Sequence, residues 1–163
     1  MEKPVAETHD ITLNINDRRY ALIVDPRLTL ADAIRGDCGL TGTHLGCEHG
    51  VCGACTIVLD GAPVRACLMF AVQADGCTLR TVEGLAEGDS FHPLQQAFME
   101  HHALQCGFCT PGFLMLAVAL LEHNPDPGDD EIRDALSSNL CRCTGYQNIL
   151  KAVSAAAAAM KAT

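Results

Sequence analysis

Hydrophobic and polar residues alternate in two short runs near the beginning of the chain. Apolar side chains occupy every second position over residues 11–15 and again over residues 20–24, and Asn16-Asp17 lies between the runs. A period of two is typical of a strand with one buried face, and a polar pair of this kind favours a tight turn. The pattern therefore predicts two neighbouring strands joined by that turn.

Three further segments complete the first half of the chain. Residues 29–32 read Thr-Leu-Ala-Asp, which resembles a capping box and favours the start of a short helix. Residues 55–59 and 63–68 flank Asp60-Gly61, a dipeptide that is common in two-residue hairpin turns. Residues 77–82 form one more run with strand character. Together these segments predict a small mixed sheet with one helix.

The second half of the chain has helical patterns. One helix is predicted over residues 92–103, and Thr110-Pro111 supplies a cap and a proline at the first helical position of another. This second helix is apolar almost all round as far as Leu121, so we expect it to be the central one. After a proline-rich break, further helices are predicted around residues 132–136 and from residue 146 onward.

The length of 163 residues suits one ordinary domain or two small ones. Because strand patterns fill the first half and helical patterns the second, we expect an α+β protein with domains at residues 1–80 and 81–163. Each half is small for an independent domain and would gain stability from a metal site or another covalent staple.

Charge and composition exclude several classes of partner. The formal net charge is −9 and the chain has no Trp, which argues against binding nucleic acid through phosphates or through stacked bases. The first ten residues lack the apolar run of a secretory signal, and the longest apolar stretch, residues 113–121, is too short to cross a bilayer. We therefore expect a cytoplasmic protein without direct membrane insertion.

Ten cysteines are the outstanding feature of the composition. Since the cytosol keeps thiols reduced, clustered cysteines there point to metal binding or catalysis rather than to disulfides. Cys47, Cys52, Cys55 and Cys67 have the plant-type ferredoxin spacing for a [2Fe–2S] cluster. We expect one glycine-rich loop to supply three thiolates and the second strand of the hairpin to supply the fourth.

Two other metal centres fit this first group less well. Structural zinc sites usually pair two short knuckles that are far apart, whereas here three cysteines fall within nine positions. Rieske ligation would need a second Cys-His pair, which is missing. His49 is therefore interpreted as a loop residue near the cluster.

Cys106, Cys109, Cys141 and Cys143 form a second group, whose spacing alone allows zinc or iron–sulfur. Both pairs are predicted to lie at the amino termini of helices. Free N–H groups and the positive end of the helix dipole favour an anion there, so the arrangement favours a second [2Fe–2S] cluster.

Three blocks in this order resemble those of a known family. Residues 46–56, residues 105–112 (Gln-Cys-Gly-Phe-Cys-Thr-Pro-Gly) and residues 139–146 (Asn-Leu-Cys-Arg-Cys-Thr-Gly-Tyr) are similar to the small iron–sulfur subunit of the molybdenum hydroxylases. That family includes xanthine dehydrogenase, aerobic carbon monoxide dehydrogenase, aldehyde oxidoreductases and N-heteroaromatic hydroxylases. The resemblance extends over about residues 11–153 and implies a β-grasp plant-type ferredoxin domain followed by a four-helix bundle domain.

The resemblance also implies roles for individual residues. Gln105 matches a glutamine that approaches the molybdopterin cofactor of the large subunit. Cys38 and Cys77 match no ligand position and are expected to be small buried hydrophobic residues. The implied ligands of the outer cluster and then of the inner cluster are Cys47, Cys52, Cys55 and Cys67, and Cys106, Cys109, Cys141 and Cys143.

The implied function is electron transfer within a larger oxidoreductase. Substrate would be oxidised at a molybdenum–pterin site on a large subunit, and this chain would pass electrons through the inner and then the outer [2Fe–2S] cluster to FAD on a medium subunit or to another acceptor. Molybdopterin, in its cytosine dinucleotide form, and FAD would be held by these partners in a dimer of heterotrimers. No catalytic residue is assigned to this chain.

Two alternatives from other functional classes remain. One is a free-standing ferredoxin-type carrier with two clusters, which would dock transiently on several reductases. The other is a zinc-stabilised interaction module without a redox role. Zinc without acid-labile sulfide would identify the interaction module. A free-standing carrier would purify alone, whereas a subunit would co-purify with a molybdenum protein.

Overall fold

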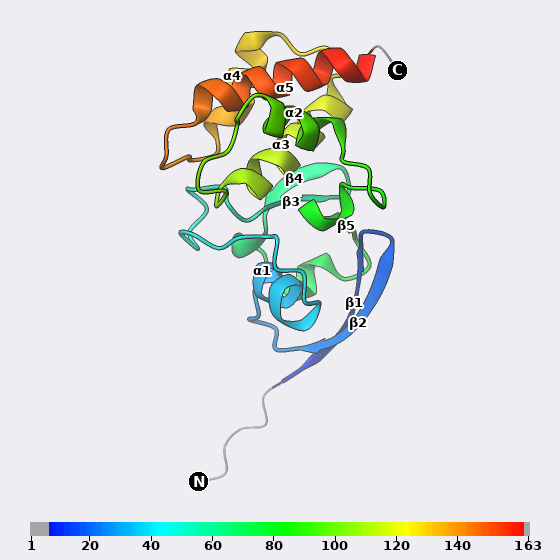
Figure 1. Ribbon diagram of the computed structural model, residues 1–163. Helices are drawn as coiled ribbons and strands as arrows, with labels where there is room; N and C mark the ends of the chain where they lie inside the picture. Colours follow the sequence, from blue (N-terminus) through cyan, green and yellow to red (C-terminus); the bar gives the residue numbers. More distant parts are fainter. Residues whose placement is uncertain (1–6, 162–163) are drawn as a thin grey trace.

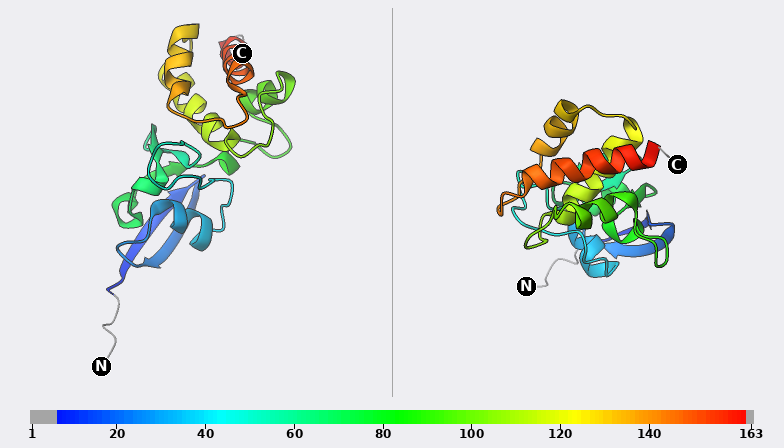
Figure 2. Two further views of the ribbon diagram at one scale, coloured as in Figure 1. Left: turned by 90° about the vertical axis from the view of Figure 1, so that its left-hand side faces the viewer. Right: turned by 45° about the horizontal axis from the view of Figure 1, so that its top comes forward.

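The computed structural model describes residues 7–161. A β-sheet region and a helical region lie end to end, with the sheet next to the amino terminus and the helices next to the carboxyl terminus (Figure 1). The view turned by 90° separates the same two regions (Figure 2). The expectation that the first ten residues are not a secretory signal falls mainly on residues 1–6, which lie outside the described part.

The sheet region is a five-stranded mixed sheet in the order β2-β1-β5-β3-β4, in which β1 and β5 are parallel and the other neighbours are antiparallel. A short helix, α1 (Leu30–Asp32), begins at Thr29, whose Oγ1 accepts from the Asp32 N–H at 3.1 Å, and it continues as a π-helical turn. The mixed sheet and the short capped helix were both predicted. The strands are β1 (His9–Ile15), β2 (Arg18–Val24), β3 (Thr56–Leu59), β4 (Ala62–Arg65) and β5 (Thr78–Arg80).

Two tight turns set the register of the hairpins. Asn16 and Asp17 have φ of 51° and 60°, and Asp60 and Gly61 have φ of 47° and 84°. Two consecutive left-handed residues are the signature of the turn that matches the twist of paired strands. The hairpin after Asp60-Gly61 is shorter than expected, because its second strand ends at Arg65 and a 3-10 turn (Ala66–Leu68) follows.

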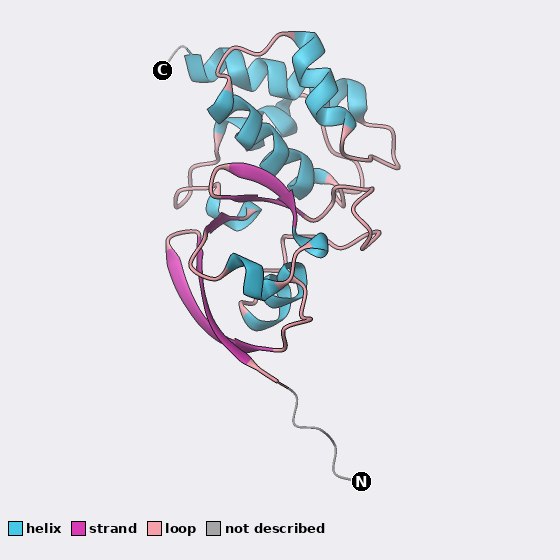
Figure 3. Cartoon of the chain, turned by 180° about the vertical axis from the view of Figure 1, so that it is seen from behind, coloured by secondary structure: helices cyan, strands magenta, loops and turns pink. Residues whose placement is uncertain are grey.

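The helical region contains α2 (Pro93–Glu100), α3 (Thr110–His123), α4 (Asp129–Ser137) and α5 (Tyr146–Lys161). Seen from behind, these helices cover one end of the sheet, next to β3 and β4 (Figure 3). α3 is buried along almost its whole length, as the sequence predicted for the central helix. No helix of residues 7–161 is both long enough and apolar enough to cross a membrane.

Strand β3 is shared by two hydrophobic cores. Ile57 packs in the core of the sheet region with Leu13 and Leu79, whereas Val58, its neighbour, packs in the core of the helical region. Successive side chains of a strand point to opposite faces, so a strand buried on both faces joins the two cores. Its continuous apolar run follows from this position.

The two regions approach to backbone contact at Gly53. A methyl group on Gly112, in the first turn of α3, would lie 2.3 Å from the Gly53 carbonyl oxygen. A Cβ on Gly53 itself would lie 1.9 Å from Oδ1 of Asn139, and Gly53 also has φ of +72°. Gly53, Gly112 and Asn139 therefore form a seam, named here the glycine seam, in which neither glycine has room for a side chain.

We predict that Gly112→Ala destabilises the protein by about 1–3 kcal/mol, the usual cost of overpacking a filled interior. Thermal unfolding of the cluster-loaded protein measures this as a lower midpoint. Gly36→Ala is the matched control, because Gly36 is exposed and a Cβ there meets nothing within 4 Å. Equal midpoints for the two variants would show that the seam tolerates the extra methyl group.

Candidate metal centres

The first cysteine group lies in the loop before β3 and in the 3-10 turn after β4. Cys47, Cys52 and Cys55 belong to the loop, and Cys67 to the turn, so the fourth thiol comes from just beyond the hairpin strand and not from the strand itself. The Cys52 N–H points at Cys47 Sγ at 3.3 Å, and the Cys55 and Cys67 sulfurs are 3.3 Å apart. Cys52 also interacts electrostatically with Cys55, so all four cysteines of the group are brought together as two neighbouring pairs.

Backbone N–H groups and burial act differently on the thiols of this group. Hydrogen bonds from the backbone of Cys52 and of His49 lower the pKa of Cys47 to about 6. Burial raises the pKa of Cys55 to about 11. Donors that stabilise a thiolate also stabilise the sulfur of a bound metal cluster, and a dry pocket limits contact with water.

The second group also forms two pairs, at the amino termini of α3 and α5. Side-chain interactions join Cys106 to Cys143 and Cys109 to Cys141. Cys141 and Cys143 lie in a loop just before α5, as predicted, and the Gly145 N–H points at Cys141 Sγ at 3.2 Å. Burial raises the pKa of Cys109 to about 12.

The start of α3 differs from the prediction by one residue. Cys109 occupies the N-cap position, and Thr110 is the first residue of the helix instead of its cap. Thr110 Oγ1 is buried and has no hydrogen-bond partner among residues 7–161. The shift places a thiol directly at the positive end of the helix.

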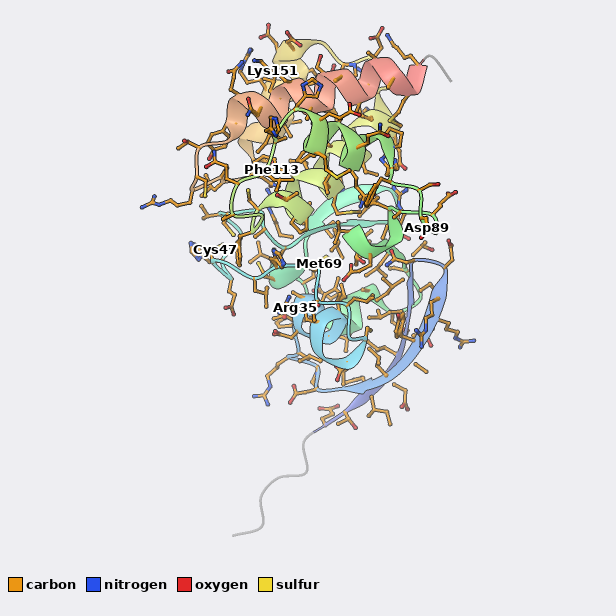
Figure 4. All side chains as sticks on the ribbon, in the orientation of Figure 1. Arg35, Cys47, Met69, Asp89, Phe113 and Lys151 are labelled. Carbon is orange, nitrogen blue, oxygen red and sulfur yellow. The ribbon has the colours of Figure 1, made fainter. Side chains whose placement is uncertain are left out.

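A cavity of about 610 Å³ lies between the two cysteine groups. Gly46 lines it, and a Cβ on this residue would lie 3.2 Å from Cys52 Sγ and 3.4 Å from the ring of Phe108. Figure 4 shows Cys47 at the edge of the molecule, between Phe113 of the helical region and Arg35 beside α1. The cysteines that line the cavity come from both groups: Cys47, Cys52, Cys106, Cys109 and Cys141.

The arrangement of sulfurs fits a two-iron cluster in each group. The four thiols of each group form two pairs, and a [2Fe–2S] cluster has two irons that share four thiolate ligands. Backbone N–H groups aimed at Cys47 and Cys141 add the donors that an anionic cluster needs.

Exposure differs along the row of candidate residues. Gln105 and Cys106 are exposed, whereas Cys55, Cys67 and Cys141 are buried. The chain therefore presents one end of the second group at its surface. The side-chain nitrogen of Gln105 lies near Gly145, so both helix-start loops of the second group meet there.

Three other predicted residues lie beside these sites. His49 is exposed, and its Nδ1 lies 2.6 Å from the carbonyl oxygen of Cys47, as expected for a loop residue near the first group. Cys38 and Cys77, expected to be buried hydrophobic residues, pack against the sheet core and are partly buried. Burial raises the pKa of Cys38 to about 11.

Sequence reasoning missed the contacts that join the two groups. The Leu140 N–H donates to the carbonyl oxygen of Cys52 at 2.9 Å. The Arg65 guanidinium donates to the Ser138 carbonyl at 2.6 Å and also to Thr56 Oγ1. Gly112 is the last residue of the family block 105–112 and Asn139 is the first residue of the block 139–146, so the sequence could have indicated both. Nothing in the pattern of β4 indicated a role for Arg65.

Two family models match the chain side by side. Residues 13–86 match a 2Fe-2S iron-sulfur cluster binding domain, and residues 81–154 match a [2Fe-2S] binding domain. These two ranges contain all eight cysteines of the two groups.

Similar proteins match over almost their whole length. The nicotine 6-hydroxylase small subunit of Paenarthrobacter nicotinovorans is 61% identical over 144 residues, which cover 88% of this chain and 87% of that subunit. Caffeine dehydrogenase subunit gamma of Pseudomonas sp. (strain CBB1) is 57% identical over 149 residues, which cover 90% of this chain and 89% of that subunit.

A solved structure matches as well. A chain of quinoline 2-oxidoreductase from Pseudomonas putida 86 superimposes with a TM-score of 0.91 and 52% sequence identity, covering 95% of this chain and 97% of that one. With both cysteine groups assembled and both family models matched, the chain belongs to the family of small iron–sulfur subunits of the molybdenum hydroxylases.

Proposed function

We propose that this chain is the electron-transfer subunit of a molybdopterin-dependent hydroxylase. In this role it carries electrons from a molybdenum–pterin site through two [2Fe–2S] clusters to FAD or another acceptor. The observation that carries the proposal is the pair of four-thiol groups on either side of one cavity. Each cluster, when bound, takes up and passes on one electron at a time.

The proposed ligands are the eight clustered cysteines. Cys47, Cys52, Cys55 and Cys67 would hold the outer cluster, and Cys106, Cys109, Cys141 and Cys143 the inner one. The chain's own groups prepare both sites before metal binds. The N–H groups of Cys52 and Gly145 face sulfur, and the start of α3 adds its dipole at Cys109. Gly46 leaves room next to Cys52 Sγ that a larger residue would fill.

The inner group is proposed to face the large subunit. Gln105 and Cys106 are exposed, so both can approach a pterin held by a partner. The partners would be a large subunit with molybdopterin cytosine dinucleotide and a medium subunit with FAD, assembled in the cytoplasm as a dimer of heterotrimers. The compound names nicotine, caffeine and quinoline among the similar proteins support a nitrogen heterocycle as the substrate of the assembled enzyme.

We further propose that the chain divides into domains at residues 1–80 and 81–163. The first would be a β-grasp domain and the second a four-helix bundle. Supporting this division, one hydrophobic core gathers around the sheet and another around α2–α5, in which each helix packs against at least two others. Strand β3 contributes to both cores and so would lie at their junction.

We predict about four iron atoms and about four acid-labile sulfides per chain, because the proposed function requires two clusters of two irons each. Elemental analysis of the purified complex measures both quantities. Zinc without sulfide would contradict both iron–sulfur functions and favour an interaction module. A chain that carries both clusters but purifies without a molybdenum protein would favour the free-standing carrier.

We predict that Cys109→Ala removes one of the two electron paramagnetic resonance signals of the reduced clusters and leaves the other intact. Cys109 is paired with Cys141 in the second group, whereas Cys55 and Cys67 are paired with each other in the first. Cys38→Ala is the control, since this thiol belongs to neither group, and it should keep both signals. Two intact signals in the Cys109 variant would refute the ligand assignment.

We predict that a nitrogen heterocycle reduces the clusters of the complex anaerobically, as seen by bleaching of their visible absorption. Nicotine, caffeine and quinoline serve as probes, and an aliphatic aldehyde and carbon monoxide serve as comparisons. Bleaching by the aldehyde or by carbon monoxide alone would assign a different substrate class while leaving the electron-transfer role intact.

A further inference from the structure

A direct hydrogen bond connects the two cysteine groups. The carbonyl oxygen of Cys52 accepts from the N–H of Leu140 at 2.9 Å, and Leu140 is bonded to Cys141. Cys52 belongs to the first group and Cys141 to the second, and both line the cavity between the groups. The route from one sulfur to the other therefore consists of covalent bonds and a single hydrogen bond.

A half-buried arginine holds the backbone on both sides of this hydrogen bond. Arg65, the last residue of β4, donates through Nη2 to the carbonyl oxygen of Ser138 at 2.6 Å. Through Nη1 it donates to Thr56 Oγ1, which in turn donates to the carbonyl oxygen of Gly53 at 2.6 Å. Gly53 follows Cys52, and Ser138 precedes the Asn139-Leu140 segment, so one side chain ties both loops.

The Asn139 side chain also lies between the two loops, but within residues 7–161 it contributes packing and no directional hydrogen bond. Asn139 is 1% exposed, and neither its Nδ2 nor its Oδ1 has a hydrogen-bond partner among the described residues. Its amide packs against Gly53 through van der Waals contact only. Charge-assisted hydrogen bonds in a fixed fork are stronger and more directional than such contacts, so Arg65 sets how the two loops face each other.

We propose that Arg65 is a positioning residue for electron transfer between the two clusters. This inference rests on the proposed function. In the step concerned, one electron leaves the cluster held by the second group, which is oxidised, and enters the cluster held by the first group, which is reduced; no proton or atom is transferred. The Arg65 guanidinium donates to Thr56 and Ser138, and it acts by keeping the Leu140-to-Cys52 hydrogen bond formed.

The test uses the whole complex with Arg65→Met, which keeps an unbranched side chain but removes every donor. With both clusters reduced, each unpaired spin splits the resonance of the other, and the splitting decreases steeply as the two move apart. We expect this splitting to shrink in the variant and electron arrival at the first-group cluster to slow, while iron and sulfide per chain and the signal of each cluster persist. Arg65→Lys, which retains the charge and donors, should recover part of the splitting.

Arg80→Met is the matched control. Arg80 also ties the sheet region to the helical region, through a hydrogen bond of 2.7 Å to Glu122, but this pair lies at the opposite end of α3 from Cys109. Thr56→Val is a milder second variant, because it cuts only the link from Arg65 to Gly53. We expect unchanged splitting in the Arg80 variant and reduced splitting in the Thr56 variant.

The outcomes separate this inference from the function on which it rests. Unchanged splitting in Arg65→Met overturns the positioning role, and if that variant lacks clusters, unchanged splitting in Thr56→Val overturns it. Equal loss in Arg65→Met and Arg80→Met also overturns it, since any bridge between the regions would then suffice. A native complex with fewer than two clusters would instead refute the proposed function.

Discussion

Backbone contact between two cysteine-bearing loops is the constraint on which the rest of this structure depends. Gly53 lies between Cys52 and Cys55, and it touches both the first turn of α3 and the segment that leads to Cys141. Such contact is possible only where side chains are absent, which accounts for glycine at positions 53 and 112. The sheet and the helices are thereby held so that both thiol groups border one cavity.

Burial differs between the individual thiols of the two groups. The thiols of Cys55 and Cys67 are enclosed by the sheet region, while Cys106 opens to the surface beside Gln105. Buried thiols keep water away from part of each site, and the exposed Cys106 allows a partner to approach the second group closely. The chain thus presents one thiol of the second group at its surface and encloses other thiols beside the shared cavity. This arrangement suits electron transfer through the protein.

Local patterns predicted most of the fold and the grouping of the cysteines. Alternation gave β1 and β2, the Asp60-Gly61 turn gave the β3–β4 hairpin, and apolar residues all round gave α3 its central place. These features depend on residues close together in the chain. Spacing likewise placed Cys47, Cys52 and Cys55 in one loop.

Contacts between distant segments were not predictable in the same way. Arg65 and Ser138 are 73 residues apart, and a charged residue at the end of a strand is ordinarily a solvated one. The local pattern also did not predict that Cys67 lies in a 3-10 turn or that Cys109 lies at the cap of α3. Residues whose importance lies in long-range geometry leave little trace in local periodicity.

The double burial of β3 limits how far the protein is modular. Val58 belongs to the core of the helical region and Ile57 to that of the sheet region, so both cores include side chains of the same strand. An excised sheet region would expose the apolar side chains of β3 that face the helices. The isolated helices would lose the strand against which their core packs. Recombination between such proteins would therefore have to exchange both cluster-bearing regions as one inherited unit.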